Sequence, residues 1–306
     1  MSNRLVSALL TAACFASLLT AIGCGDVQRS IEPQAGAASV AVAGEEASIA
    51  SLDATRATTA AEEEGDLLWH DHATPIKSAT IITQPGDYRL VADLDVADGD
   101  AIVVRASDVR LWLGDYRLRG PGNKQGRAIV LDGVQRVSAS GGHIERFGFG
   151  AVLLGSSQCR VHGLDIQGGD ETADPANGNP PQIGIMMVNS AMNRVRGNSM
   201  RGINLGIFVR GGGSYENSIR NNVVVGAQHG LLGICYNPAP GGDPAGPQHD
   251  RVSGNTLARF GTGITASAQS AQNYFTGNSI GYFDVAYVDL NGTNVFERNR
   301  TRQLKR

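Results

Sequence analysis

Residues 193–198 read NRVRGN, and this pattern returns four more times toward the C-terminus. It recurs as NSIRNN at 217–222, DRVSGN at 250–255, NYFTGN at 273–278 and NVFERN at 294–299. The apolar centres are 24 residues apart from Val195 to Ile219, 23 from Val252 to Phe275 and 21 from Phe275 to Phe296. A period of this length predicts a solenoid, in which each coil buries its inner face only by stacking on its neighbours.

A second kind of apolar strand alternates with these segments. Its glycine- or alanine-led members lie at 128–131, 150–154, 184–188, 206–209, 230–234, 263–266 and 286–290. Three short strands per repeat, 40 glycines and only 18% charged residues favour an all-β class. Leucine-rich repeats and left-handed β-helices fit worse, because neither the LxxLxLxxN spacing nor a hexapeptide period is present.

The recurring asparagines have a structural explanation. Asparagine tolerates left-handed backbone angles at a tight turn. Stacked from coil to coil, its amide can also hydrogen-bond along the axis as a ladder. We therefore interpret these residues as structural and not as catalytic.

On these repeats the chain resembles the right-handed parallel β-helix superfamily, with its pectate-lyase-like and NosD-like carbohydrate-binding and sugar-hydrolase repeats. Residues 82–86 (ITQPG), 98–102 (DGDAI) and 141–144 (GGHI) resemble its opening coils. The resemblance implies a right-handed parallel β-helix of about eight coils, running from about Ile76 to the C-terminus. It implies no particular activity, since one fold hosts many functions.

The N-terminus resembles a lipoprotein signal. Arg4 precedes the apolar residues 5–22, and residues 21–24 read AIGC, similar to a lipobox whose Cys24 would be lipidated. Gly25 in place of an acidic residue favours sorting to the outer membrane or cell surface. A signal cleaved elsewhere and an uncleaved anchor are the alternatives. We expect a signal peptide at 1–23, a flexible linker at 24–68 and the β-helix domain at 69–306.

Arginine recurs on the outward face predicted for the NRVRGN-type strands. Alternation places Leu111, Val137, Val161, Val195, Ile219 and Val252 inside. The preceding outward positions are then Arg110, Arg136, Arg160, Arg194, Ser218 and Arg251, and the following ones are Trp112, Ser138, His162, Arg196, Arg220 and Ser253. This stripe suits a linear polyanion, because guanidinium groups bind carboxylates in fork geometry. The alternative is a set of structural arginines paired with neighbouring acids.

Three further features remain open on sequence alone. An apolar strip of Val130, Leu153, Met186, Phe208 and Leu231 is either covered by another segment, such as residues 67–69, or forms a hydrophobic cleft. In the insertion at 168–182, Asp170, Glu171 and Asp174 could gather Ca²⁺ or could merely be solvated. Cys159 and Cys235 are expected to be buried free thiols, and no CxxC or Cys/His zinc spacing is present.

These observations lead to several hypotheses on function. The first is an envelope-anchored lipoprotein that binds an acidic polysaccharide or other glycan through Arg136, Arg160, Arg194, Arg251 and Trp112. The second is a polysaccharide lyase, in which Arg194, Arg196 and Arg220 neutralise a uronate and His162 or Tyr236 is the base. The third is an enzyme acting on a hydrophobic small molecule at Met186 and Phe208, and NosD-like metal handling is a further alternative.

The partners follow from the same reading. A net charge of −3 gives no reason to expect nucleic acid. We expect a monomer that contacts a membrane through its lipid anchor only. No cofactor is certain, and Ca²⁺ is the one considered.

Overall fold

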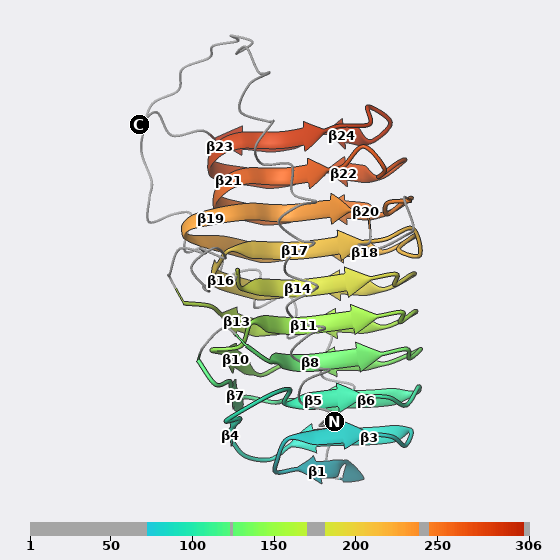
Figure 1. The fold of residues 1–306 in the computed structure, drawn as a ribbon, viewed down its shortest axis with the longest axis vertical. Coiled ribbons are helices and arrows are strands. Elements are labelled where there is room, and N and C mark those ends of the chain that lie inside the picture. Colours follow the sequence, from blue (N-terminus) through green and yellow to red (C-terminus); the bar gives the residue numbers. More distant parts are fainter. Residues whose placement is uncertain (1–71, 123–124, 170–180, 239–244, 303–306) are drawn as a thin grey trace, which may run out of the picture. The chain divides into compact units, whose positions relative to one another are not determined.

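The computed structural model describes residues 72–122, 125–169, 181–238 and 245–302. These residues form strands and turns without any α-helix, and every strand pairing among them is parallel. No helix of the described part is long and apolar enough to cross a membrane. The chain winds coil upon coil (Figure 1), so the predicted right-handed parallel β-helix is confirmed. The first sheet holds ten strands where about eight coils were expected, because the opening coils lack the asparagine signature.

The strands fall into three stacks along the axis. The ten-stranded sheet contains β1 (Thr74–Ile76), β3 (Gly86–Leu90), β6 (Val109–Trp112), β9 (Ser138–Ser140), β12 (Arg160–His162), β15 (Arg194–Arg196), β18 (Ser218–Arg220), β20 (Arg251–Ser253), β22 (Tyr274–Thr276) and β24 (Val295–Glu297). The second stack contains β2 (Thr80–Ile82), β5 (Ile102–Val104), β8 (Arg127–Asp132), β11 (Phe149–Leu154), β14 (Ile183–Val188) and β17 (Leu205–Arg210). The third contains β4 (Leu94–Asp95), β7 (Arg117–Arg119), β10 (His143–Glu145), β13 (Asp165–Gln167) and β16 (Ser199–Ile203).

The later coils join the second and third stacks into one sheet. β19 (Val223–Asn237) pairs with β16 through its first residues and with β17 through its last. In its pairing with the following strand of the stack, the register shifts between Val225 and Gly230. β21 (Thr256–Ala266) and β23 (Ser279–Asp289) continue both stacks in the same way, and β25 (Arg300–Arg302) pairs with β23. A continuous strand therefore turns the corner that separate strands make in earlier coils.

The glycines at the start of the second-stack strands line up from coil to coil. Gly150, Gly184, Gly206, Gly233 and Gly263 occupy one row of the register. A Cβ on Gly206 would lie 2.2 Å from the carbonyl oxygen of Gly233, and the other four would meet a backbone oxygen of the next coil at 2.5–2.7 Å. The recurring glycine in the sequence is thus required by the close approach of successive backbones.

The predicted asparagine ladders are present inside the two turns that flank the ten-stranded sheet. One ladder runs Asn193, Asn217, Asp250, Asn273, Asn294, and the other runs Asn198, Asn222, Asn255, Asn278, Asn299. In each, the side-chain oxygen accepts the backbone N–H of the ladder residue one coil earlier, at 2.7–3.1 Å. Buried backbone donors are satisfied in this way, which stabilises the stack.

The left-handed role predicted for these asparagines is wrong for the ladder residues. Left-handed angles occur instead at the residue just before a ladder residue. Before the first ladder φ lies between 54° and 57° at Met192, Glu216, His249 and Gln272, and before the second it lies between 53° and 65° at Gly197, Asn221, Gly254, Gly277 and Arg298. The glycine of the NRVRGN pattern makes the turn, and the asparagine after it makes the ladder.

Candidate functional site

The outward residues of the ten-stranded sheet form two parallel rows on its face. The first row reads Asp87, Arg110, Ser138, Arg160, Arg194, Ser218, Arg251, Tyr274, Val295, and the second reads Arg89, Trp112, Ser140, His162, Arg196, Arg220, Ser253, Thr276, Glu297. Five arginines thus lie on the four adjacent strands β12, β15, β18 and β20, and all five are exposed. We call Arg160, Arg194, Arg196, Arg220 and Arg251 the arginine face.

Arg136 does not belong to the arginine face, which corrects the sequence alignment. Ser138, and not Arg136, is in register with Arg160. Arg136 adopts a left-handed turn at φ 56° before β9, and its guanidinium binds Asp108 at 2.6 Å and 2.8 Å. This ion pair lowers the pKa of Asp108 and raises that of Arg136. The coil that separates Ala139 from Val161 is therefore two residues shorter than the alignment of Val137 with Val161 assumed.

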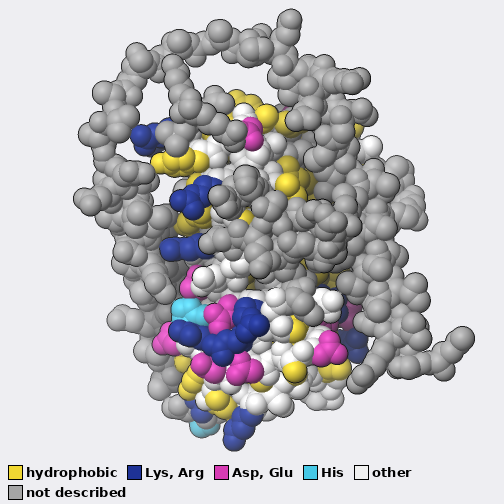
Figure 2. Space-filling view, turned by 60° about the vertical axis from the view of Figure 1, so that its left-hand side comes forward, with side chains coloured by type: hydrophobic (Ala, Val, Ile, Leu, Met, Phe, Trp, Pro, Cys, Tyr) yellow, Lys and Arg dark blue, Asp and Glu magenta, His cyan; other side chains and the backbone are white. Residues whose placement is uncertain are grey.

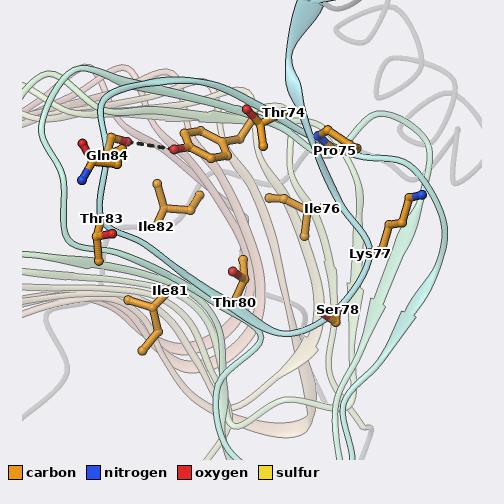
Figure 3. A pocket seen from close by; sticks show the side chains of 11 residues that line it. Thr74, Pro75, Ile76, Lys77, Ser78, Thr80, Ile81, Ile82, Thr83 and Gln84 are labelled. Atoms are coloured by element: carbon orange, nitrogen blue, oxygen red, sulfur yellow. Dashed lines mark hydrogen bonds between the residues drawn. The ribbon is translucent and has the colours of Figure 1, made fainter.

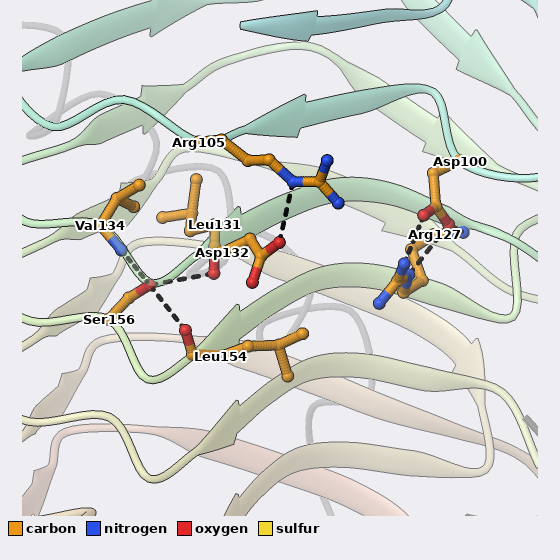
Figure 4. A network of polar contacts seen from close by, with 8 residues as sticks. All are labelled: Asp100, Arg105, Arg127, Leu131, Asp132, Val134, Leu154 and Ser156. Carbon is orange, nitrogen blue, oxygen red and sulfur yellow. Dashed lines mark hydrogen bonds and ion pairs between the residues drawn. The ribbon is translucent and has the colours of Figure 1, made fainter. Parts of the chain in front are cut away.

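Several arginines of the early coils have carboxylate partners. Arg110 binds Asp87 at 2.6 Å, and Arg119 binds Glu145 at 2.6 Å and Asp95 at 2.9 Å. At the two ends of β8, Asp132 binds Arg105 at 3.0 Å and Arg127 binds Asp100 at 2.9 Å (Figure 4). These pairs are structural, as the alternative interpretation of the arginines supposed.

Four arginines of the arginine face lack the carboxylate partners that the early-coil arginines have. Arg160, Arg194, Arg220 and Arg251 make no ion pair and no side-chain hydrogen bond with any residue in the described part of the chain. Moreover, Arg160 stands directly beside Arg194, and Arg196 directly beside Arg220, on neighbouring strands. Like charges in such cross-strand positions destabilise a sheet. This arrangement therefore leaves a concentrated positive charge available to an anion.

The opposite pattern is found on the third stack. Its outer face carries Asp95, Arg119, Glu145, His143 and Asp165, and Figure 2 shows side chains of both charges lying together on this side. Besides the Arg119 pairs, His143 Nδ1 lies 3.0 Å from Asp165 Oδ2. Charges that satisfy each other leave little net field, so this face is a weaker candidate for an anion site.

The predicted catalytic residues are only partly brought together. His162 is half-buried, lies in register between Ser140 and Arg196, and has its Nε2 3.5 Å from Ser138 Oγ. Arg196 and Arg220 follow it in the same row. Trp112 is half-buried in that row too, two strands before His162.

Tyr236 cannot be the base of a reaction on this face, which corrects the second hypothesis. Its side chain is fully buried in the core, edge-on to Phe275 at 5.3 Å. It occupies the inward row that also holds Val209 and Ala266. Burial raises the pKa of its phenol well above the usual range, and the nearby Asp250 carboxyl adds to the effect.

The sequence reasoning missed one residue of the face. Tyr274 follows Arg251 in the first row and is 48% exposed. A shallow hollow lies beside it, lined by Arg220, Arg251, Ser253, Tyr274 and Thr276. The repeat could have predicted this position, because Tyr274 is the second residue of NYFTGN as Arg251 is the second residue of DRVSGN.

The apolar strip of the second stack is not an open cleft along its length. The row that contains Met186 and Phe208 also contains Val130, Val152 and Cys235, so Leu153 and Leu231 were assigned to it wrongly. Leu153 faces the core beside Leu131 and Met187. Phe208 is 1% exposed with the guanidinium of Arg210 over its ring, and Met186 is half-buried. The third hypothesis therefore lacks an accessible surface at Phe208.

Another hollow lies at the first described coil, lined by residues of β1, β2 and β3. Figure 3 shows Ile76 and Ile82 pointing into this coil, with Ile81 directed away from it. The Tyr88 hydroxyl donates to the carbonyl oxygen of Gln84 at 3.0 Å across it. Among the described residues that line it, Lys77 is the only charged one. We interpret it as the end of the β-helix interior and not as a ligand site.

Several predicted residues lie outside the described part of the chain. These are the lipidation residue Cys24 and the calcium candidates Asp170, Glu171 and Asp174. The prediction of buried free thiols is confirmed for Cys159 and Cys235. Burial raises the pKa of the Cys159 thiol, which makes it a poor metal ligand or nucleophile.

Stacked coils whose strands pair in parallel define the class of parallel β-helix proteins. A family model described as periplasmic copper-binding protein (NosD) matches residues 98–304. Because this match covers more than half of the chain, the protein belongs to the NosD family. No curated protein matches the chain.

Solved structures with a similar fold include two glycan-related proteins. A mutant tailspike protein of E. coli bacteriophage HK620 in complex with a pentasaccharide is 10% identical, with a TM-score of 0.48, and the match covers 77% of this chain and 51% of the tailspike chain. The endo-xylogalacturonan hydrolase from Aspergillus tubingensis is 12% identical, with a TM-score of 0.28, and the match covers 74% and 87%. This chain thus spans about half the length of the tailspike chain. Neither likeness says what this chain binds.

The family description raises the question of copper. Copper sites gather soft or imidazole ligands, namely Cys, Met and His side chains, at one point. Across the described ranges, no three or more His, Cys, Asp or Glu side chains come together in a way that could hold a metal ion. Cys159 lies at the turn before β12 and Cys235 lies on β19, and both are buried. The His, Cys, Asp and Glu side chains of the described residues therefore do not form a copper site by themselves.

Proposed function

We propose that this protein binds an acidic polysaccharide along the arginine face of the ten-stranded sheet. The observation that supports this most is the stacking of Arg160 directly beside Arg194, with no carboxylate of the described residues paired to either, and with the unpaired Arg220 and Arg251 on the next two strands. A bound polyanion would supply the missing negative charge. Since strands are about 4.8 Å apart, the face from β12 to β20 presents a cation on each of four successive strands over roughly 14 Å.

The chemistry of the groups agrees with this ligand class. Guanidinium groups bind planar carboxylates through two parallel hydrogen bonds, and they stay charged at any physiological pH. Among the ten strands of the sheet, the only carboxylates are Asp87 on β3 and Glu297 on β24, near the two ends of the stack. Asp87 is already bound by Arg110. Export supports access to such a glycan, since residues 1–23 resemble a signal peptide and the family is described as periplasmic.

The test is a titration of the full chain with polygalacturonate at two salt concentrations. Each exposed arginine contributes about 1 kcal/mol or less, so Arg194→Ala and Arg220→Ala should each weaken binding roughly three- to fivefold, and Arg160, Arg194, Arg220 and Arg251 all changed to Ala should abolish it. Raising the salt should weaken wild-type binding. Arg105→Ala, which removes an arginine already paired with Asp132, is the matched control and should leave the affinity unchanged.

Two outcomes would contradict this proposal. One is wild-type protein that binds polygalacturonate no better than neutral dextran. The other is a fourfold arginine variant that retains wild-type affinity.

A lyase is the second candidate, favoured by the placement of His162 in register beside Arg196. In β-elimination a base takes the proton α to the uronate carboxylate, a carbon–carbon double bond forms, and the glycosidic oxygen leaves with the bonding electrons. Arginines would stabilise the carboxylate while His162 Nε2 takes the proton. The same titration samples distinguish a lyase from a binding protein. For a lyase, ultraviolet absorbance of unsaturated uronate should appear with wild type and be lost in His162→Ala. No absorbance increase with bound polymer would leave a binding protein.

A further inference from the structure

The hollow beside Tyr274 lies where the arginine face stops being purely basic. Arg220 of β18 forms one side, and Arg251 of β20 with Tyr274 of β22 forms the other. Between them the second row carries only the small hydroxyl residues Ser253 and Thr276. The depression exists because these two side chains are shorter than their neighbours in both rows.

Its lining combines three kinds of groups at one place. Arg220 and Arg251 are exposed guanidiniums that make no ion pair with the rest of the described chain. Ser253 and Thr276 are half-buried and bring hydroxyls that can donate or accept. Tyr274 presents an aromatic ring that is 48% exposed.

We propose that this hollow is the subsite that recognises a single hexuronic-acid residue of the polysaccharide. This inference rests on the proposed function and deepens it. The apolar C–H face of the pyranose packs on the ring of Tyr274, while Arg220 and Arg251 bind the carboxylate and the two hydroxyls bind sugar hydroxyls. A tyrosine ring offers such a face a large rigid surface at low cost in conformational entropy. Glu297, next in the row after Thr276, repels a second carboxylate beyond the hollow.

This assignment separates two contributions to affinity. The row Arg160–Arg194 attracts any polyanion, because charge alone does not depend on a sugar ring. Tyr274 contributes only when a pyranose is present. The hollow is therefore the part of the face that distinguishes an acidic glycan from another polymer of similar charge.

The experiment compares polygalacturonate with inorganic polyphosphate, which has the charge but no sugar ring. Tyr274→Ala should lower affinity for polygalacturonate about five- to tenfold and change polyphosphate affinity less than twofold. Tyr274→Phe should retain most of the polygalacturonate affinity, because the ring remains. Tyr282→Ala, which removes an exposed tyrosine of β23 outside this face, should change neither.

Equal losses for both polymers in Tyr274→Ala, or no loss for polygalacturonate, would overturn the subsite and leave the arginine face intact. Wild-type protein that binds neither polymer would overturn the proposed function itself. Because Tyr274 is exposed, its variants should fold, and an unchanged melting temperature confirms that.

Discussion

Asp250 occupies a ladder position that asparagine fills in the four other coils. Its side chain is fully buried, and Asn217 donates to its Oδ1 from the backbone at 2.7 Å and from the amide at 3.2 Å. Each ladder asparagine also donates through its own Nδ2, as Asn273 does to the carbonyl oxygen of Pro247. A carboxylate has no proton to donate, whereas a neutral carboxyl has one. The bonds that Asp250 accepts from Asn217 favour its charged form, so only burial favours the protonated form, which could also donate as the ladder asparagines do.

Burial raises the pKa of Asp250 from 3.8 to about 7, although hydrogen bonds from Asn217 act in the opposite direction. A folded-state pKa above the unfolded value means that the folded state binds the proton more tightly. Its stabilising effect is complete below pH 3.8 and is lost as the pH rises through about 7. The protein should thus lose stability toward neutral and alkaline pH at this residue.

Asp250→Asn tests this assignment. The amide restores the missing donor without changing shape, so the variant should be more stable than wild type at pH 8, by an amount on the order of 2–4 kcal/mol. At low pH, where the wild-type carboxyl is neutral, the two proteins should unfold at nearly the same denaturant concentration. Chemical denaturation across this pH range measures the difference. A variant less stable than wild type at pH 8 would contradict a neutral buried carboxyl.

At the scale of a strand, register depends on which residue of each coil begins the strand. The period of the asparagine segments predicted β15, β18, β20, β22 and β24 correctly, because their ladders fix both ends of the strand. The coil before β12 has no asparagine pair, so Val161 was aligned with Val137 although it pairs with Ala139. This error of two residues placed Arg136 on the face in the sequence analysis. The signal that was missing is the left-handed turn at Arg136.

The apolar strands were harder to predict for a different reason. Residues 151–154 read AVLL and 185–188 read IMMV, so they are apolar at every position. Parallel strands that are buried on both faces lack the alternation that separates inside from outside. The sequence therefore could not decide whether Val152 or Leu153 belonged to the outer strip. Tyr236 was assigned to the surface because its strand was not recognised to continue that far.

The glycine row offers a test of strand packing. Gly206→Ala places a Cβ 2.2 Å from the backbone oxygen of Gly233, and backbone cannot move aside cheaply. The variant should lose at least about 2 kcal/mol of stability and about 5 °C in melting temperature. Gly281→Ala is the matched control, because no atom lies within 4 Å of the added methyl, and it should melt close to wild type. Equal melting temperatures for both variants would contradict the coil-to-coil contact.

At the scale of the whole domain, stacking converts residues some two dozen positions apart into neighbours. This is how Arg160, Arg194, Arg220 and Arg251 come to share one face although the intervening sequence separates them. Several arginines of the early coils bind acids, whereas Arg160, Arg194, Arg220 and Arg251 of the middle coils pair with no acid among the described residues. Under the proposed function, these unfavourable like-charge neighbours cost some stability, and the binding surface that they form is the return.

The measurement that bears most directly on this face is the affinity for oligogalacturonates of increasing length. The surface from Arg160 on β12 to Tyr274 on β22 spans four inter-strand steps, roughly 19 Å. Affinity should rise with each added uronate until the oligomer is about that long and then level off. In the variant with all four arginines replaced by alanine, the rise should disappear. Affinity that is independent of oligomer length in wild type, or that still rises in the variant, would contradict a polysaccharide site on this face.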